Sequence, residues 1–190
     1  MKIQKSIEDS IKLKNNILQS KSLLETIENV SEEIVQSVQK GGKVFFCGNG
    51  GSAADAQHLA AELSGRFYYD RAPLPAEALH TNTSYLTAVA NDYGYDEVYA
   101  RLLKGNAKKG DILIALSTSG NSSNIFKAIK TATDIGMISI GFTGLTGGKM
   151  KDCCCYLINV PSEDTPRIQE AHIMIGHIIC EIVESKIFPR

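Results

Sequence analysis

Short apolar segments alternate with helical segments along most of the chain. After Gly42 the apolar residues no longer recur at helical spacing but gather in short runs, of which Ile112–Leu116 and Met137–Phe142 are the clearest. Such runs are typical of strands that are buried on both faces, and their separation by helices favours parallel pairing. The pattern therefore predicts an α/β fold, in which helices cover both faces of a parallel sheet.

We expect five strands in this sheet and a helix after most of them. Besides the two clear runs, the expected strands are Lys43–Cys47, Ala76–Leu79 and Tyr156–Val160. The expected helices are Ser52–Ser64, Ser84–Ala90, Glu97–Lys104, the residues after Ser123 to about Ile135, and Pro166–Ile187. Ser52 and Asp55 have the S-x-x-D spacing of a helix cap, so we expect them to begin the first of these helices.

The first 40 residues are predicted to be helical. Ile3, Ile7, Ile11 and Leu18 recur at the spacing of an amphipathic helix. A capping box at Ser22 and Glu25 predicts a break near residues 20–22. We therefore divide the chain into an N-terminal helical extension, residues 1–40, and an α/β domain, residues 41–190. The apolar stripe of the extension either covers that domain or forms an oligomer interface.

Composition excludes several classes of protein. The chain has 20 Lys and Arg against 21 Asp and Glu, a formal net charge of -1, which disfavours a general nucleic-acid binder. Its apolar runs are far shorter than a membrane span, and the first ten residues lack an apolar signal core. We expect a cytoplasmic protein without nucleic-acid or membrane partners. The five cysteines include no CxxC pair, so we expect buried, reduced thiols.

Two polar loops each follow an expected strand and begin an expected helix. Ligands collect at such places, the carboxyl ends of strands in open α/β sheets. In the first loop, Cys47–Ser52, glycines allow the backbone to approach a ligand, and the following helix offers free N–H groups. It lacks the lysine of a P-loop and the spacing of a dinucleotide fingerprint. A plain tight turn would explain this loop equally well.

The second loop, Ser117–Asn124, favours a phosphate. Five of its eight residues carry hydroxyl groups, and a glycine lies among them. Hydroxyls and backbone N–H groups at a helix start bind a phosphomonoester without needing a cation. Serine and asparagine are also ordinary helix caps, but capping needs only one or two of them.

Polar groups on two helices suggest a metal or an acid–base site. His58 and Glu62 are four residues apart and so lie on one face of the helix after the glycine loop. The last helix carries Gln169, Glu170, His172 and His177. Histidine and glutamate are zinc ligands, and glutamate also serves as a general base. Alternatively, His58 is an ordinary surface histidine.

These residues together resemble those of a known family. The segment CGNGGSAADAQHLAAEL, from Cys47 to Leu63, is similar to the signature of phosphoheptose isomerases, which belong to the sugar isomerase (SIS) domain superfamily. The similarity continues through ANDYG (90–94), LSTSGNSSN (116–124) and RIQEAHIMIGHIIC (167–180). The STSGNS motif alone indicates only a SIS domain, whereas its combination with the residues on the two helices is more specific.

The resemblance implies a fold, an assembly and a set of site residues. It implies a flavodoxin-like parallel five-stranded sheet and a homotetramer with active sites at subunit interfaces. It implies one zinc per subunit, with His58, Glu62, Gln169 and His177 as ligands. Substrate contacts would come from Asn49, Gly50, Gly51, Ser52, Glu62, Arg66, Asn91, Asp92, Ser117, Thr118, Ser119, Ser122 and Gln169. Glu62 and His177 match the catalytic base and acid.

The implied reaction converts sedoheptulose 7-phosphate into D-glycero-D-manno-heptose 7-phosphate, the first step of ADP- or GDP-heptose biosynthesis. It passes through an enediol, so one group removes a proton from carbon and another protonates oxygen. Glu62 suits the first role and His177 the second. Gln169 and His177 are eight residues apart, about 12 Å along a helix, which makes it hard for both to reach one ion. Glutamine is also a weak, neutral ligand, so we expect Gln169 to be the longest or most variable metal contact.

Two alternatives stay open. One is a non-catalytic SIS-domain binding protein of the DnaA initiator-associating type, and the complete set of metal residues argues against it. The other is an isomerase or a binding domain for a different sugar phosphate, such as an amino sugar.

Overall fold

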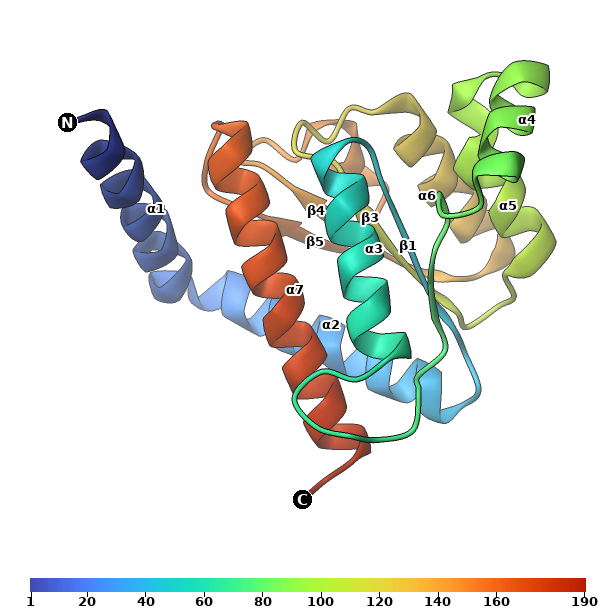
Figure 1. The fold of residues 1–190 in the computed structure, drawn as a ribbon, viewed down its shortest axis with the longest axis horizontal. Helices are drawn as coiled ribbons and strands as arrows, with labels where there is room; N and C mark the ends of the chain where they lie inside the picture. The colour runs from blue at the N-terminus through green and yellow to red at the C-terminus, as the bar shows by residue number, and fades with distance from the viewer.

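The protein is built around a five-stranded parallel sheet (Figure 1). The computed structural model describes residues 1–190. The strands are β1 (Val44–Gly48), β2 (Ala76–Ala78), β3 (Ile112–Leu116), β4 (Ile138–Thr143) and β5 (Tyr156–Asn159). Their order in the sheet is β2-β1-β3-β4-β5, and all four pairings are parallel. This is the strand order of flavodoxin-like sheets, so the predicted fold class is confirmed.

The chain forms seven α-helices. They are α1 (Lys2–Gln19), α2 (Lys21–Gln39), α3 (Gly51–Ser64), α4 (Thr83–Tyr93), α5 (Val98–Asn106), α6 (Ser123–Ile135) and α7 (Thr165–Ile187). A short 3-10 turn, η1 (Tyr95–Glu97), joins α4 to α5, and a second, η2 (Gly148–Asp152), lies between β4 and β5. None of the helices has both the length and the apolar character that a bilayer span requires.

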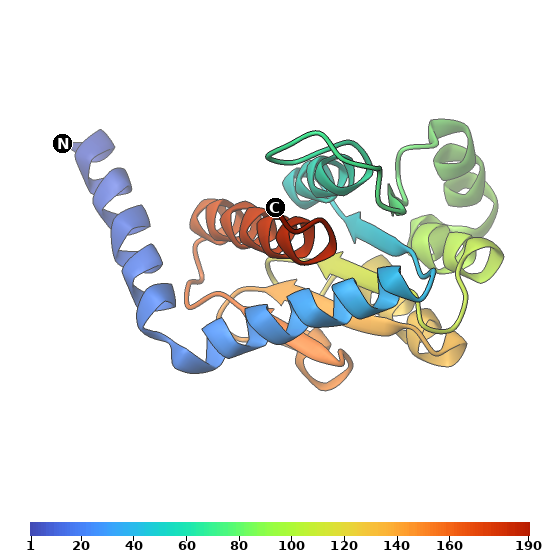
Figure 2. The same ribbon diagram turned by 90° about the horizontal axis from the view of Figure 1, so that it is seen from below.

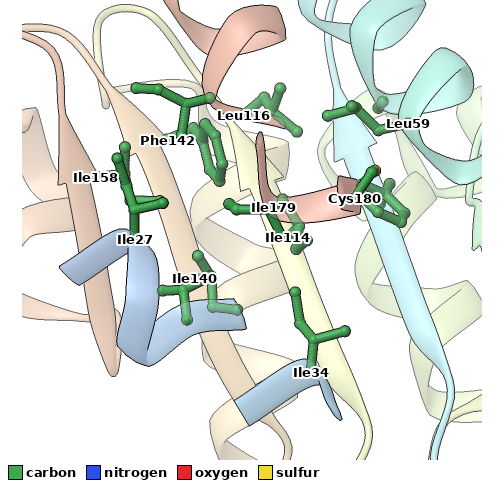
Figure 3. Packing of buried hydrophobic residues seen from close by; sticks show 14 of the residues in the cluster. Ile27, Ile34, Leu59, Ile114, Leu116, Ile140, Phe142, Ile158, Ile179 and Cys180 are labelled. Atoms are coloured by element: carbon green, nitrogen blue, oxygen red, sulfur yellow. The ribbon is translucent and has the colours of Figure 1, made fainter. Parts of the chain in front are cut away.

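The buried strands place alternate residues in two apolar cores. Val44 and Phe46 of β1 belong to a core of 28 buried residues, which α2, α3 and α7 complete on one face (Figure 3). Phe45 and Cys47 belong to a second core of 15 buried residues with α5 and α6 on the other face. Each large side chain buried in this way contributes about 1.5–3 kcal/mol. Successive strand residues point to opposite faces of the sheet, so apolar side chains lie on both faces and helices cover both.

Both predicted side-chain caps are wrong. Ser20, not Ser22, precedes α2, so Ser22 lies inside the first turn and no side chain caps this helix. The predicted break near residues 20–22 is confirmed, since α1 ends at Gln19. Helix α3 begins at Gly51, after Gly50 with φ +56°, and Ser52 is buried in its first turn. The glycine conformation starts this helix earlier than the serine cap would.

The cysteine prediction is confirmed only in part. Cys47 and Cys180 are buried, and burial raises the pKa of the Cys180 thiol to about 12. Cys155 is exposed. It precedes β5, which is the edge strand of the sheet, and an edge has a neighbouring strand on one side only.

Helix α1 projects away from the rest of the molecule (Figures 1 and 2). Only Leu13 and Ile17 of this helix are buried, whereas Ile3 is 77% exposed and Ile7 is 55% exposed. Ile11 and Leu18 are exposed as well, so the predicted stripe does not cover the domain, and the helix is buried through Leu13 and Ile17 instead. Helix α2, in contrast, contributes to the larger core. The division of the chain at residue 40 stays a prediction.

Candidate active site

The two polar loops meet at the carboxyl ends of the adjacent strands β1 and β3. Strands β1 and β3 are neighbours, with Gly48 paired to Leu116, so the loops that follow them begin side by side. The side-chain amides of Asn49 and Asn124 exchange two hydrogen bonds of 2.9 and 2.8 Å. The strand order reverses between β1 and β3, which is where ligands bind in open α/β sheets.

The glycine loop has backbone features that other residues would not permit. Gly50 adopts φ +56°, in the left-handed region that favours glycine. Gly51 lies against Gln169 of α7, whose Nε2 would be 2.5 Å from an added Cβ. The loop thus brings the start of α3 to the first turns of α7, and Gln169 lies at this junction. The N–H groups of Ser52 and Ala53 already donate to the carbonyls of Asn49 and Gly50, at 3.1 and 3.0 Å, so the start of α3 favours an anion mainly through its helix dipole.

Hydroxyl groups of the serine loop are turned toward each other rather than onto the helix. Ser117 Oγ and Ser122 Oγ are 3.1 Å apart, and Ser122 precedes α6 without capping it. Thr118 and Ser119 line a polar hollow of about 280 Å³ together with Thr165, the first residue of α7. These hydroxyls and the free N–H groups of the α6 start are the donors that a phosphate needs.

His58, Glu62 and His177 converge from two helices. One ligand atom of each lies within 4.8 Å of the others. His58 Nε2 is 2.9 Å from Glu62 Oε1, and the rings of His58 and His177 meet edge to face at 5.0 Å. His177 Nε2 is buried and has no hydrogen-bond partner. Two imidazole nitrogens and a carboxylate fit a zinc ion that keeps further ligand positions open. The nitrogen without a hydrogen-bond partner is free to bind such an ion.

The cluster is open to small molecules. The side chain of His58 is 50% exposed and that of Glu62 is 23% exposed, so solvent reaches both. Phe67 also packs against His177, with the ring centroids 5.6 Å apart. The arrangement therefore exposes the Glu62 carboxylate and the His58 imidazole to a substrate, while the His177 ring packs against both His58 and Phe67.

Other predicted residues lie apart from these loops in the single chain. Asn91 and Asp92, at the end of α4, are exposed and hydrogen-bonded to each other at 2.9 Å. Tyr95 in the following turn reaches Asn49, with its hydroxyl 3.5 Å from Oδ1. Arg66 is exposed after α3 and donates only to the carbonyl of Phe67, at 3.3 Å.

His172 points into the core. It donates through Nε2 to the Thr143 carbonyl at 3.1 Å, and burial lowers its pKa to about 4. A histidine in this environment is neutral at physiological pH and supports the fold. Among the histidines of α7, only His177 joins the cluster.

Three residues at the site were missed by reasoning from sequence. Asp55 has a buried, unpartnered Oδ2 one turn before His58, and burial raises the pKa of its carboxyl group. Its i+3 spacing to His58 was a signal that could have indicated it. Asn124 joins the two loops and Phe67 packs on His177, but these contacts cross long stretches of chain and have no local signal.

Known proteins are similar to this chain in both sequence and fold. The model of the SIS domain family matches residues 9–144. The chain is 53% identical over 186 residues to a phosphoheptose isomerase of Aneurinibacillus thermoaerophilus, covering 98% of this chain and 94% of that protein. It is 51% identical to a phosphoheptose isomerase of Clostridium acetobutylicum, covering 98% and 95%.

Two solved structures agree over nearly the whole length. The structure of a phosphoheptose isomerase from Neisseria gonorrhoeae superposes with a TM-score of 0.91 at 40% identity and covers 97% of each chain. That of a phosphoheptose isomerase from Francisella tularensis gives a TM-score of 0.93 at 35% identity, with the same coverage. The similarity therefore includes both polar loops, α3 and α7.

Proposed function

The chain belongs to the phosphoheptose isomerase family of SIS-domain proteins, and from that premise we propose how its residues act. It is an aldose–ketose isomerase that interconverts sedoheptulose 7-phosphate and D-glycero-D-manno-heptose 7-phosphate. The observation that carries the mechanism is the convergence of Glu62 and His177 from α3 and α7. One carboxylate and one imidazole side by side supply the base and the acid that the isomerisation requires.

Glu62 and His177 exchange protons with the first two carbons of the sugar. The Glu62 carboxylate removes a proton from C1 of the ketose, while the His177 imidazolium protonates the carbonyl oxygen on C2. The product of this step is an enediol. His177 then takes the proton from the oxygen on C1, and Glu62 returns its proton to C2. This sequence forms the aldose and restores both side chains to their starting protonation states.

The serine loop is proposed to hold the phosphate. Ser117, Thr118, Ser119 and Ser122 offer hydroxyl donors at the start of α6, where the helix also favours an anion. The glycine loop, with Asn49 to Ser52, would bind the hydroxyls of the sugar between the phosphate and the cluster. Gln169 lies beside this loop and would contact the same part of the substrate.

We propose that His58, Glu62 and His177 hold one zinc ion per chain, with Gln169 as a weaker further ligand. The unsatisfied Nε2 of His177 supports this assignment. When bound, the ion supplies positive charge that stabilises negative charge developing on the substrate oxygens. A metal-bound Glu62 is a poorer base than a free one, since the ion stabilises its anionic form. A metal-bound imidazole nitrogen likewise carries no proton, so His177 is an imidazolium only when it is not a ligand. Glu62 and His177 therefore act as base and acid only if their contacts with the ion are labile.

A homotetramer with sites at subunit interfaces is our proposal for the assembly. The exposed stripe of Ile3, Ile7 and Ile11 supports it, because these residues line a hollow of about 660 Å³ with Arg167 and Glu170 of α7. A neighbouring chain placed there would approach the start of α7, close to Gln169. Asn91, Asp92 and Arg66 would then contact substrate within such an assembly. The substitutions Ile7→Lys and Ile11→Lys together should lower the sedimentation coefficient, and an unchanged one would contradict the interface.

The location and the pathway are also proposals. We propose that the enzyme works in the cytoplasm, because a phosphorylated sugar is charged and does not enter a bilayer unaided. Its product would serve nucleotide-heptose synthesis, for lipopolysaccharide, capsule or another glycan.

One incubation tests the activity against the alternatives. Sedoheptulose 7-phosphate is mixed with the protein, and the aldose signals are followed by NMR. An amino-sugar phosphate serves as the competing substrate. Aldose formation that the Glu62→Gln variant lacks supports the proposed mechanism. Tight binding without turnover would instead favour the binding-protein hypothesis, and turnover of the amino sugar alone would favour the other isomerase.

A further inference from the structure

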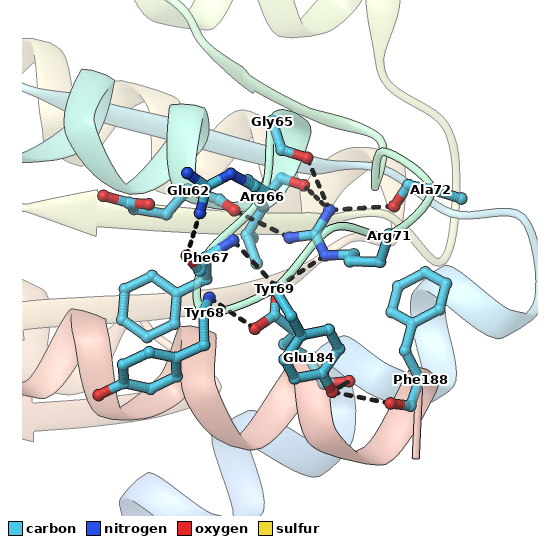
Figure 4. A network of polar contacts seen from close by, with 11 residues as sticks. Glu62, Gly65, Arg66, Phe67, Tyr68, Tyr69, Arg71, Ala72, Glu184 and Phe188 are labelled. Carbon is cyan, nitrogen blue, oxygen red and sulfur yellow. Dashed lines mark hydrogen bonds and ion pairs between the residues drawn. The ribbon is translucent and has the colours of Figure 1, made fainter. Parts of the chain in front are cut away.

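A buried ion pair joins the loop after α3 to the end of α7 (Figure 4). Arg71 Nε is 2.9 Å from Glu184 Oε1, and the two side chains are 2% and 1% exposed. Fully buried pairs of this kind rarely increase stability over an apolar pair of the same size, because both charges lose their hydration. The reason for this pair therefore has to be sought in what else the two side chains hold.

Arg71 holds the C-terminal end of α3. Its terminal nitrogens donate to the carbonyls of Glu62 at 2.9 Å, Leu63 at 2.8 Å and Gly65 at 3.0 Å. The last carbonyls of a helix have no partners within the helix, and a cation is favourable there. One of the carbonyls that Arg71 binds belongs to Glu62, the proposed base.

Glu184 holds the loop itself. Its two carboxylate oxygens accept the N–H groups of Phe67 at 2.9 Å and Tyr68 at 2.8 Å. The backbone position of Phe67 is thus determined by a residue on α7. The ring of Phe67 in turn packs on His177 at a centroid distance of 5.6 Å.

The pair therefore connects the two helices that carry the catalytic cluster. His58 and Glu62 lie on α3, and His177 lies on α7, two turns before Glu184. Elsewhere these two helices meet through close packing, as where Gly176 faces Leu59. The hydrogen bonds of the pair give the contact a definite distance and direction, which packing alone specifies less strictly.

We propose that Arg71 and Glu184 are positioning residues of the isomerase site. They fix the end of α3 against α7, so that Glu62 and His177 stand at the right separation and Phe67 holds the His177 ring in place. This inference rests on the proposed function, since it concerns the same cluster. The opposing explanation is that the pair only closes a surface loop and stabilises the fold.

A charge-matched double variant separates these explanations. In Arg71→Met with Glu184→Gln neither charge is left buried without a partner, and the introduced glutamine side chain would keep an oxygen for the loop N–H groups. The control is Lys186→Met, which removes the exposed ion pairs from the same end of α7 to Glu28 and Glu32. For each protein we would measure zinc affinity against a chelating dye, the visible spectrum of the cobalt form, kcat and KM.

The expected result is a folded double variant with zinc affinity and kcat lowered about 10–100-fold, as is typical when groups supporting a metal site are lost. KM should change little, because the serine loop is untouched, and the cobalt spectrum should differ from that of the wild type. Lys186→Met should match the wild type in all four measurements. Wild-type affinity, spectrum and kcat in the folded double variant would overturn the proposal.

A second variant decides the question if the double variant does not fold. Arg71→Lys keeps the charge beside Glu184 but cannot supply the guanidinium fork to several carbonyls at once. It should fold and bind zinc about tenfold more weakly, and unchanged affinity would contradict positioning. The zinc measurement needs no substrate. If the wild-type protein binds zinc but fails to isomerise the sugar, the proposed activity is wrong, while the affinity comparison still tests the positioning role.

Discussion

Replacing Gly176 by alanine should push apart the two helices that carry the catalytic cluster. A Cβ at this position would lie 2.5 and 2.6 Å from the two methyl carbons of Leu59. Carbon atoms pack at about 3.5–4.0 Å, so the new methyl group needs about 1 Å of additional separation. Leu59 is only 1% exposed within the larger core, and the hollow that it lines together with Gly176 has a volume of only about 10 Å³, which gives its methyl groups little room to move. We therefore expect the helices themselves to take up most of this separation.

The effect on activity should exceed the effect on stability. Alanine improves helix propensity by about 1 kcal/mol, whereas overpacking costs about 1–3 kcal/mol, so the net loss is at most about 2 kcal/mol. The residue after Gly176 is His177, and the residue before Leu59 is His58, whose ring lies 5.0 Å from that of His177. A displacement of about 1 Å at such a site lowers the rate about 100-fold.

The assay compares kcat/KM and the free energy of unfolding for Gly176→Ala and Gly105→Ala. An added Cβ at Gly105, near the end of α5, meets no atom within 4 Å. The Gly105 variant should be more stable by about 0.5–1 kcal/mol and fully active. In the Gly176 variant, the shorter side chain of Leu59→Val should restore part of the lost activity. If Gly176→Ala behaves like Gly105→Ala, the reasoning about helix separation is refuted.

Three further predictions concern the metal, the phosphate and acid stability. Protein purified without chelator should contain about one zinc per chain. The His58→Ala variant should lose this zinc and most activity while staying folded. Isomerisation at full rate by the metal-free wild type would exclude the ion from the mechanism. Ser119→Ala together with Ser122→Ala should raise KM, since each lost hydrogen bond to a charged group costs about 1.5–3 kcal/mol; unchanged kinetics would remove this loop from the site. Burial lowers the pKa of His172 from 6.5 to about 4, so between these values the unfolded state binds more protons than the folded state. The free energy of unfolding should therefore fall as pH drops from 6.5 toward 4, by about 3 kcal/mol from this group. In the His172→Gln variant the free energy of unfolding should depend less steeply on pH over this range. An equal slope in the variant and the wild type would contradict this assignment.

Local patterns predicted the elements of this fold accurately. The runs at Ile112–Leu116 and Met137–Phe142 became β3 and β4 because apolar strands buried on both faces leave a signal within a few residues. The residue at which each helix begins was less predictable. Ser52 has the spacing of a cap, but Gly50 begins α3 first through its backbone conformation. Side-chain spacing alone does not report that conformation.

The chain's own sequence determined the alternation of strands and helices, the two polar loops at the carboxyl ends of β1 and β3, and the residue types available for chemistry. These depend on neighbours within one or two turns or on the alternation along one strand. Only the tertiary structure decided which helices meet. Asn49 and Asn124 are 75 residues apart, and Arg71 and Glu184 are 113 apart, yet each pair is hydrogen-bonded. Such contacts depend on how whole helices pack on the sheet, since burial of apolar area, not local spacing, sets their positions.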